Sequence, residues 1–214
     1  MKIPRTYKMR RLFAAVQHHW PADAAVARFM KRKYGDMRDR NNFQGKAAEV
    51  YFNMAVRHAA FATRGEVTLK PIRRETDKGN YTFDPGPNGS VNVYDDLGGD
   101  VKEIDNLLLV DGCPVLCEVK MRGLGEGKLS TAFNKEKIKK QRSLFGDYFE
   151  QRVGYAVVVP KDLDLTVHKE VSREHTEVFH AQRRFRGAGG IVVPFKFEFE
   201  AYRERMTRLF EQTI

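Results

Sequence analysis

Two apolar runs of strand length flank Asp111-Gly112 near the middle of the chain. Residues 101–122 read VKEIDNLLLVDGCPVLCEVKMR, with leucine and β-branched residues on both sides of that dipeptide. Asp-Gly between such runs is the strongest short-range signal for a two-residue type I′ turn. The pattern therefore predicts an antiparallel hairpin in which Val110 faces Cys113, and this fixes the register of every other pair along it.

The predicted register brings charged residues together at the open end of the hairpin. Asp105 is expected directly opposite Glu118, and Glu103 opposite Lys120. Side chains two positions apart on a strand share a face, so all four are expected on one face. Directly opposed like charges destabilise a sheet, so a cation must offset the repulsion between the two acids.

Hydrophobic periodicity in the rest of the chain predicts alternating helices and strands. Helices are expected over residues 7–19, 21–34, 46–61, 134–151 and 201–212, and strands over 66–72, 153–160 and 191–199. The nearly continuous apolar run 153–160 is typical of a strand covered on both faces, whereas Pro194 places the last strand at an edge or a bulge. This order predicts an α/β fold with a central mixed β-sheet flanked by helices.

The length of 214 residues suits one well-cored domain with additions. We expect a basic helical N-terminal extension over residues 1–42 and a core domain over 43–214. The extension either lies against DNA or another subunit, or packs on its own domain with its charges in solvent. Residues 72–100 are rich in Gly, Pro, Asn and Asp and are expected to form an insertion or loop. Long loops are often functional, so this one is a candidate to cover a substrate or contact a partner.

The charge of the chain points to an anionic partner. The formal net charge is +10 and the isoelectric point about 9.6, as expected of a protein that neutralises phosphates. Candidate phosphate contacts lie in the loop after the hairpin and on the helix 134–151, where a charge run can equally be a solvated face. These candidates are Arg122, Lys128, Lys135, Lys137, Lys139, Lys140 and Arg142.

The acidic pair at the end of the hairpin has two interpretations. Asp105 and Glu118 are candidate ligands of a hard cation, because Mg²⁺ is typically held by one or two carboxylates together with substrate phosphate oxygens. Alternatively, Glu103 and Lys120 form a cross-strand salt bridge at an exposed strand end, and Asp105 is merely solvated.

The spacing of these residues resembles a known signature. An acid on one strand, Asp105, followed by Glu118-Val119-Lys120 on the next, resembles the PD-(D/E)xK (restriction-endonuclease-like) nuclease superfamily. Ile104 stands where the name of the superfamily has proline. The resemblance covers roughly residues 43–160.

Within this superfamily the chain is most similar to archaeal-type Holliday junction resolvases. These have a similar spacing between the two strands and an earlier Gly-x-x-x-Glu at the start of a helix, to which Gly45 and Glu49 correspond. The resemblance also draws attention to Gln141, because several branches of the superfamily use a helix glutamine or lysine to hold the site or the DNA.

The resemblance implies a metal-dependent endonuclease that hydrolyses phosphodiester bonds in DNA, with a restriction-endonuclease-like core. Mg²⁺, or Mn²⁺ in its place, would be held by Asp105, Glu118 and the carbonyl of Val119. Lys120 would orient or help deprotonate the attacking water, and Glu49 would reach in from its helix. The implied substrate is duplex or branched DNA, and the implied assembly is a homodimer. Alternatives are a restriction-type, mobile-element or phage nuclease acting on duplex DNA or RNA, and a non-catalytic nucleic-acid-binding subunit.

Several other functions are not expected. The loop containing Gly127-Lys128 lacks the remaining residues of a phosphate loop, having Arg122 and Leu129 at the decisive positions, so no nucleotide cofactor is expected. The three histidines of the segment 168–180 match no zinc pattern and are expected at the surface.

The cysteine spacing and the hydropathy suggest a cytoplasmic protein. Cys113 and Cys117 lie four apart on one strand, which separates them by about 13 Å and prevents a disulfide. Two free, buried thiols suit a reducing compartment. No apolar run approaches the length needed to cross a membrane, so no membrane contact is expected.

Overall fold

The computed structural model describes residues 6–70, 75–78, 81–86, 89–121 and 129–213. Its centre is a five-stranded sheet in the order β1-β6-β7-β8-β9. The strands are β1 (Val67–Leu69), β6 (Asn106–Val110), β7 (Cys113–Val119), β8 (Gly154–Val159) and β9 (Ile191–Pro194). β1, β6 and β7 pair antiparallel, whereas β7, β8 and β9 run parallel. The sheet is therefore mixed, and the α/β class predicted from the sequence is confirmed.

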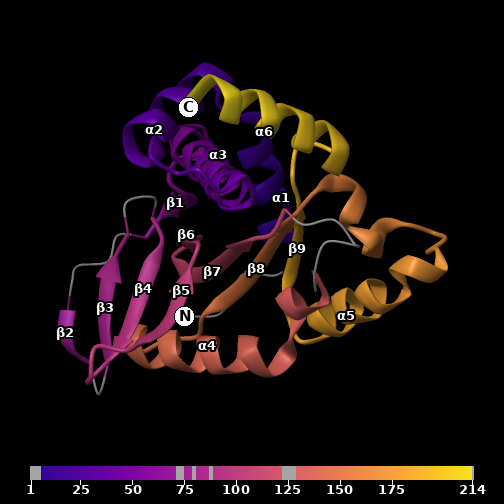
Figure 1. Cartoon of the computed structure of the whole chain (residues 1–214). Coiled ribbons are helices and arrows are strands. Elements are labelled where there is room, and N and C mark those ends of the chain that lie inside the picture. The colour runs from indigo at the N-terminus through magenta and orange to yellow at the C-terminus, as the bar shows by residue number, and fades with distance from the viewer. Residues whose placement is uncertain (1–5, 71–74, 79–80, 87–88, 122–128, 214) are drawn as a thin grey trace.

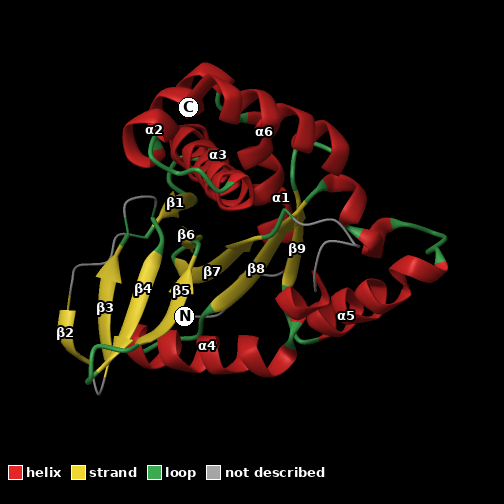
Figure 2. Ribbon diagram, viewed as in Figure 1, coloured by secondary structure: helices red, strands yellow, loops and turns green. Residues whose placement is uncertain are grey.

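Helices cover both faces of this sheet (Figures 1 and 2). On one face lie α1 (Thr6–His18), α2 (Asp23–Tyr34), α3 (Arg40–Ala62) and α6 (Phe199–Thr213), and on the other α4 (Lys135–Phe149) and α5 (Thr176–Gly187). Short 3₁₀ helices are η1 (Leu129–Phe133), η2 (Lys161–Leu163), η3 (Leu165–Val167) and η4 (Arg173–His175). None of the described helices is long and apolar enough to cross a membrane.

The N-terminal helices are part of the main core. Met9 and Phe13 of α1 and Val26 and Met30 of α2 are buried in the same cluster as the α3 and α6 side chains. The first two helices therefore belong to the core that covers one face of the central sheet.

The hairpin has the predicted register. Val110 pairs with Cys113, and the ladder continues to the other end of β6. Asp111 and Gly112 have φ values of 50° and 74°, as both central residues of a type I′ turn require. Both cysteines are free and buried, as expected.

The strand before the turn begins later than predicted, at Asn106. The chain leaves one sheet at Ile104, the end of β5 (Asp100–Ile104), and enters the central sheet at Asn106, so only Asp105 lies between the two strands. Glu103 consequently faces Asn92 in a different sheet, and its predicted pairing with Lys120 is wrong.

The described residues between 75 and 104 form a second, antiparallel sheet. Its strands are β2 (Glu75–Lys78), β3 (Tyr81–Pro85), β4 (Val91–Asp95) and β5, in that order. Phe83, Val93 and Ile104 are buried in the core that also contains α4, and Phe83 contacts Phe145 edge to face. The segment expected to be an insertion or loop therefore has strands of its own, which the sequence did not reveal because short strands between Gly- and Pro-containing turns conceal their alternation.

Two further boundaries differ from the predictions. Helix α3 begins at Arg40, where Asp39 caps it by accepting a 2.8 Å hydrogen bond from the Asn42 N–H, so Gly45 lies inside the helix. The last strand ends at Pro194, which does lie on an edge strand as predicted.

Candidate active site

Asp105 occupies the junction between the two sheets. Its Oδ2 accepts a 2.6 Å hydrogen bond from the backbone N–H of Val119 and lies 3.3 Å from the Lys120 ammonium. The side chain is 7 % exposed. A carboxylate thus accepts the hydrogen bond at the end of the β6–β7 ladder, and this contact holds Asp105 beside the end of β7.

Glu118 is the most deeply buried carboxylate of the site, at 2 % exposure. It lies on β7, on the same face as Leu116, which packs in the α4 core. Three ammonium groups surround it, at 2.9 Å from Lys120, 3.5 Å from Lys102 and 3.7 Å from Lys137. The predicted approach of Asp105, Glu118 and Lys120 is therefore present in the structure.

Lys120 bridges the two carboxylates. Its Nζ lies 3.3 Å from Asp105 Oδ2 and 2.9 Å from Glu118 Oε2. Burial alone lowers the pKa of Lys120, but the two carboxylates outweigh burial and raise this pKa above its ordinary value. The side chain therefore remains a cation at neutral pH.

The two carboxylates differ in their titration. Burial raises the pKa of both groups, and for Asp105 it outweighs the opposing effect of Lys120, so that this pKa is raised. For Glu118 the charges of Lys120, Lys102 and Lys137 outweigh burial and hold the pKa at about 2. Adjacent carboxylates in unlike environments are typical of functional sites, although structural ion-pair networks produce them too.

Glu49 approaches the site from α3, on the opposite face of the sheet. Its Oε2 forms a 2.9 Å ion pair with Lys46, which also contacts Glu103 at 3.0 Å. Burial, followed by the charge of Asp105, raises the pKa of Glu49 to about 7. The charge of Asp105 thus affects the titration of Glu49, whereas the ion pair of Glu49 is formed with Lys46.

Gln141 is held in place behind Glu118. The buried Tyr155 hydroxyl on β8 donates a 2.7 Å hydrogen bond to Gln141 Oε1, which turns the Nε2 of the amide toward Glu118 Oε1 at 3.5 Å. Gln141 therefore contacts Glu118 of the candidate site.

Three participants in this network were not predicted. Lys46 could have been noticed, since it lies one helical turn before Glu49. Lys102 reaches Glu118 from the second sheet, whose existence the sequence did not indicate. Tyr155 is the one residue with a side-chain hydroxyl in the apolar run 153–160.

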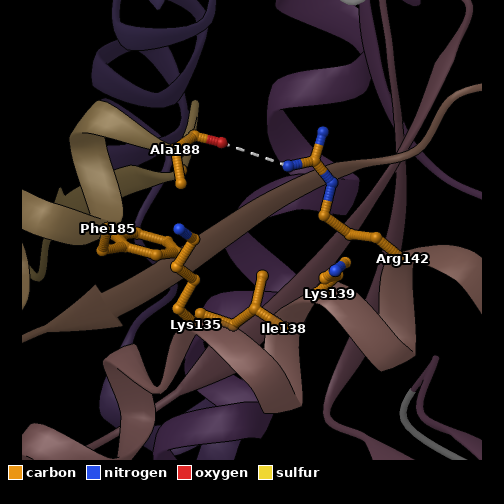
Figure 3. A pocket seen from close by; sticks show the side chains of 7 residues that line it. Lys135, Ile138, Lys139, Arg142, Phe185 and Ala188 are labelled. Atoms are coloured by element: carbon orange, nitrogen blue, oxygen red, sulfur yellow. Dashed lines mark hydrogen bonds between the residues drawn. The ribbon is translucent and has the colours of Figure 1, made fainter.

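The predicted phosphate contacts lie on two sides of α4. Lys137 and Lys140 line a groove of about 700 Å³ between α4 and the second sheet. The remaining candidates on this helix, Lys135, Lys139 and Arg142, line a separate pocket of about 190 Å³ against the end of α5 (Figure 3). Arg142 there donates to the carbonyls of Val153, at 2.9 Å, and Ala188, at 3.2 Å. Arg122 and Lys128 lie outside the described residues.

The donor set fits a divalent cation held by few protein groups. Among the described residues no three His, Cys, Asp or Glu side chains are placed to hold a metal together. Mg²⁺ does not require three, because it is commonly bound by one or two carboxylates with water and phosphate oxygens. Asp105 and Glu118 supply two carboxylates. The N–H of Val119 faces Asp105, and in a strand the carbonyl of a residue points to the same side as its N–H. The Val119 carbonyl therefore also points toward Asp105.

Comparison of the chain with protein-family models, curated proteins and solved structures finds no significant match. Any assignment of function therefore rests on the residues of the site and their geometry.

Proposed function

We propose that this protein is a metal-dependent nuclease that hydrolyses phosphodiester bonds in DNA. The observation that carries the proposal is the convergence of Asp105, Glu118 and Lys120 at the end of one hairpin, with the lysine between two buried carboxylates. The same three residues carry the resemblance to the PD-(D/E)xK superfamily. The basic character of the chain, with a net charge of +10, supports a nucleic-acid substrate.

The proposed roles follow from the environment of each side chain. Asp105, Glu118 and the Val119 carbonyl would hold Mg²⁺ or Mn²⁺, which when bound supplies a nucleophilic water at neutral pH and neutralises phosphoryl charge. Lys120 stays protonated, so it contributes positive charge toward the developing charge on the phosphate. It is therefore poorly suited to remove a proton from water.

Glu49 is better suited to accept a proton. Its pKa of about 7 is near the operating pH, which favours general base catalysis. The ion pair with Lys46 keeps the carboxylate oriented. Gln141, oriented by Tyr155, would position Glu118.

A second candidate is a nucleic-acid-binding subunit without catalysis. The observation in its favour is the balance of charge in the network, in which four carboxylates meet four lysines. These are Glu49, Glu103, Asp105 and Glu118, with Lys46, Lys102, Lys120 and Lys137. Such a network is also found in purely structural sites. The two candidates differ in metal dependence, since a binder responds to salt but needs no Mg²⁺.

The test is cleavage of labelled four-way junction, linear duplex, single-stranded DNA and RNA, each with Mg²⁺, Mn²⁺ or EDTA. Lys120→Ala tests the site, and Lys169→Ala is the matched control, because Lys169 is an exposed lysine on a different segment. Metal-dependent cleavage that only Lys120→Ala abolishes supports a nuclease, and the cleaved substrate distinguishes a junction resolvase from a duplex-cutting or RNA-cutting enzyme. Binding without cleavage under every condition supports the second candidate. The junction-resolving form of the proposal also includes a homodimer, and sedimentation measures the oligomeric state.

A further inference from the structure

The groove between α4 and the second sheet leads directly to the candidate active site. Its volume is about 700 Å³, and Lys102 and Lys137 line it on opposite sides. Both of these lysines also contact Glu118, at 3.5 and 3.7 Å. Gln141 likewise lines the groove and points its amide at Glu118. The inner end of the groove is therefore formed by residues that touch the site.

The groove carries cations on both of its sides. Lys102, Lys137 and Lys140 line it, and Lys140 is exposed on α4 one position beyond the pocket-facing Lys139. Two carboxylates, Glu136 and Asp147, also belong to the lining. The lysines lie where a chain of phosphates could follow the helix toward Glu118.

The groove also exposes apolar surface. Tyr81 on β3 is 36 % exposed and Val101 on β5 is 42 % exposed, and both line the groove. Phe83, two residues from Tyr81 on the same face, is buried against α4 residues. The ring of Tyr81 is therefore on the face of the sheet that looks toward α4, at the margin of the packed core.

We propose that this groove binds an unpaired nucleic-acid strand and guides it to the site. Phosphate-binding lysines combined with exposed aromatic side chains form the usual surface for single strands, because the faces of unpaired bases can stack on the rings. A duplex keeps its base faces stacked internally and would gain little from Tyr81 and Val101. The inference deepens the proposed nuclease function by assigning its substrate class, a single strand or a single-stranded branch of a larger structure.

The chain offers matched controls for both kinds of contact. Tyr94 lies on the neighbouring strand β4, opposite Thr82, and therefore on the other face of the sheet from Tyr81. Lys140 and Lys169 are both exposed lysines, but only Lys140 is among the residues that line the groove. Each pair of variants therefore removes the same chemical group, once inside the groove and once outside it.

The experiment measures binding of the full-length protein by fluorescence anisotropy without divalent metal, so that cleavage cannot occur. The probes are a labelled single-stranded dT oligonucleotide, the RNA counterpart and a duplex of the same length. The variants are Tyr81→Ala, Tyr94→Ala, Lys140→Gln and Lys169→Gln, each checked for folding by circular dichroism.

The expected result is that Tyr81→Ala weakens single-strand binding at least about fivefold, the smallest effect typical of losing one base–aromatic contact. Tyr94→Ala is expected to change it less than about twofold. Lys140→Gln is expected to reduce the salt slope by about one, and Lys169→Gln to leave it unchanged. Equal effects of the two tyrosine variants, or tighter binding of duplex than of single strand, would overturn the inference.

Failure of this inference and failure of the nuclease proposal give different results. Cleavage assays with Mg²⁺ on the same variants separate them. Metal-dependent cleavage of duplex that is indifferent to Tyr81→Ala overturns the strand groove and leaves the nuclease. Tyr81-dependent strand binding without cleavage by any protein supports the groove and removes the nuclease.

Discussion

The backbone N–H of Val119 donates a 2.6 Å hydrogen bond to Oδ2 of Asp105. Because the side chain of Asp105 takes this hydrogen bond, one carboxylate both closes the ladder between β6 and β7 and forms part of the candidate site. Its structural and chemical roles can be separated by substitution.

Asp105→Asn retains an oxygen that can accept the hydrogen bond from Val119, whereas Asp105→Ala removes it. We expect both variants to lose cleavage by about 100-fold or more, since each lacks the negative charge that would hold the metal. Only the alanine variant is expected to lose stability, by about 1–3 kcal/mol, because it leaves a buried N–H without a partner. Urea denaturation and single-turnover cleavage measure the two effects. Full activity of folded Asp105→Asn would exclude a role for the charge.

Lys120→Ala removes the cation shared by Asp105 and Glu118. Glu118 retains Lys102 and Lys137, so the protein is expected to fold. Cleavage is expected to fall by about 10²–10³-fold, as when a preorganised electrostatic group is removed, while affinity for nucleic acid changes little. Binding and cleavage measured on the same substrate test this separation. A parallel loss of both would mean that Lys120 serves binding.

Tyr155→Phe deletes the hydroxyl that orients Gln141. We expect a loss of stability of about 1 kcal/mol and a severalfold drop in cleavage that higher metal concentration partly restores, because Glu118 is less well positioned. Tyr202→Phe is the control, since Tyr202 is equally buried and donates to the Gln44 carbonyl on the α3 side. The interpretation fails if the two variants, equally stable, are also equally active.

Asp23 links α2 to α3 and α6, and this link is expected to weaken in acid. Its carboxylate accepts 2.7 Å hydrogen bonds from Tyr51 and Arg205, which outweigh burial and lower the pKa of Asp23 below its ordinary value of 3.8. The contribution to stability is therefore present above about pH 4 and is lost as pH falls through the lower folded-state pKa. Asp23→Asn is expected to cost up to about 1 kcal/mol at pH 7, because the side chain is 41 % exposed.

Urea denaturation between pH 2.5 and 7 tests the Asp23 prediction. The difference between the wild type and Asp23→Asn is expected to shrink as the pH falls, whereas Asp96→Asn, at an exposed position, provides the baseline. A difference independent of pH would show that the carboxylate charge contributes nothing.

The sequence was informative where structure is determined locally. The Asp111-Gly112 turn fixes the hairpin register through the positive φ values of its two residues, and the approach of Asp105 to Glu118 follows from it. The cap at Asn134 and the helix after it are likewise local, because the Asn134 side chain accepts from the N–H groups of the first turn.

Contacts between distant segments were not predictable in the same way. The run 101–110 looks continuous, yet it divides at Asp105 because its first half pairs with β4, a partner hidden among short strands. Lys102 thereby reaches Glu118, and Glu103 turns to Lys46 on α3. Neither contact has a signal in the spacing of residues, since both depend on how two sheets meet.

The passage of the chain from β5 through the single residue Asp105 into β6 makes the second sheet inseparable from the site. A shortened protein lacking residues 75–104 would lose Lys102 and the strand that fixes the backbone immediately before Asp105. The second sheet is thus not an optional appendage that could be trimmed to a minimal catalytic unit. Any smaller engineered version would need a replacement strand that delivers the chain to Asp105 from the same direction.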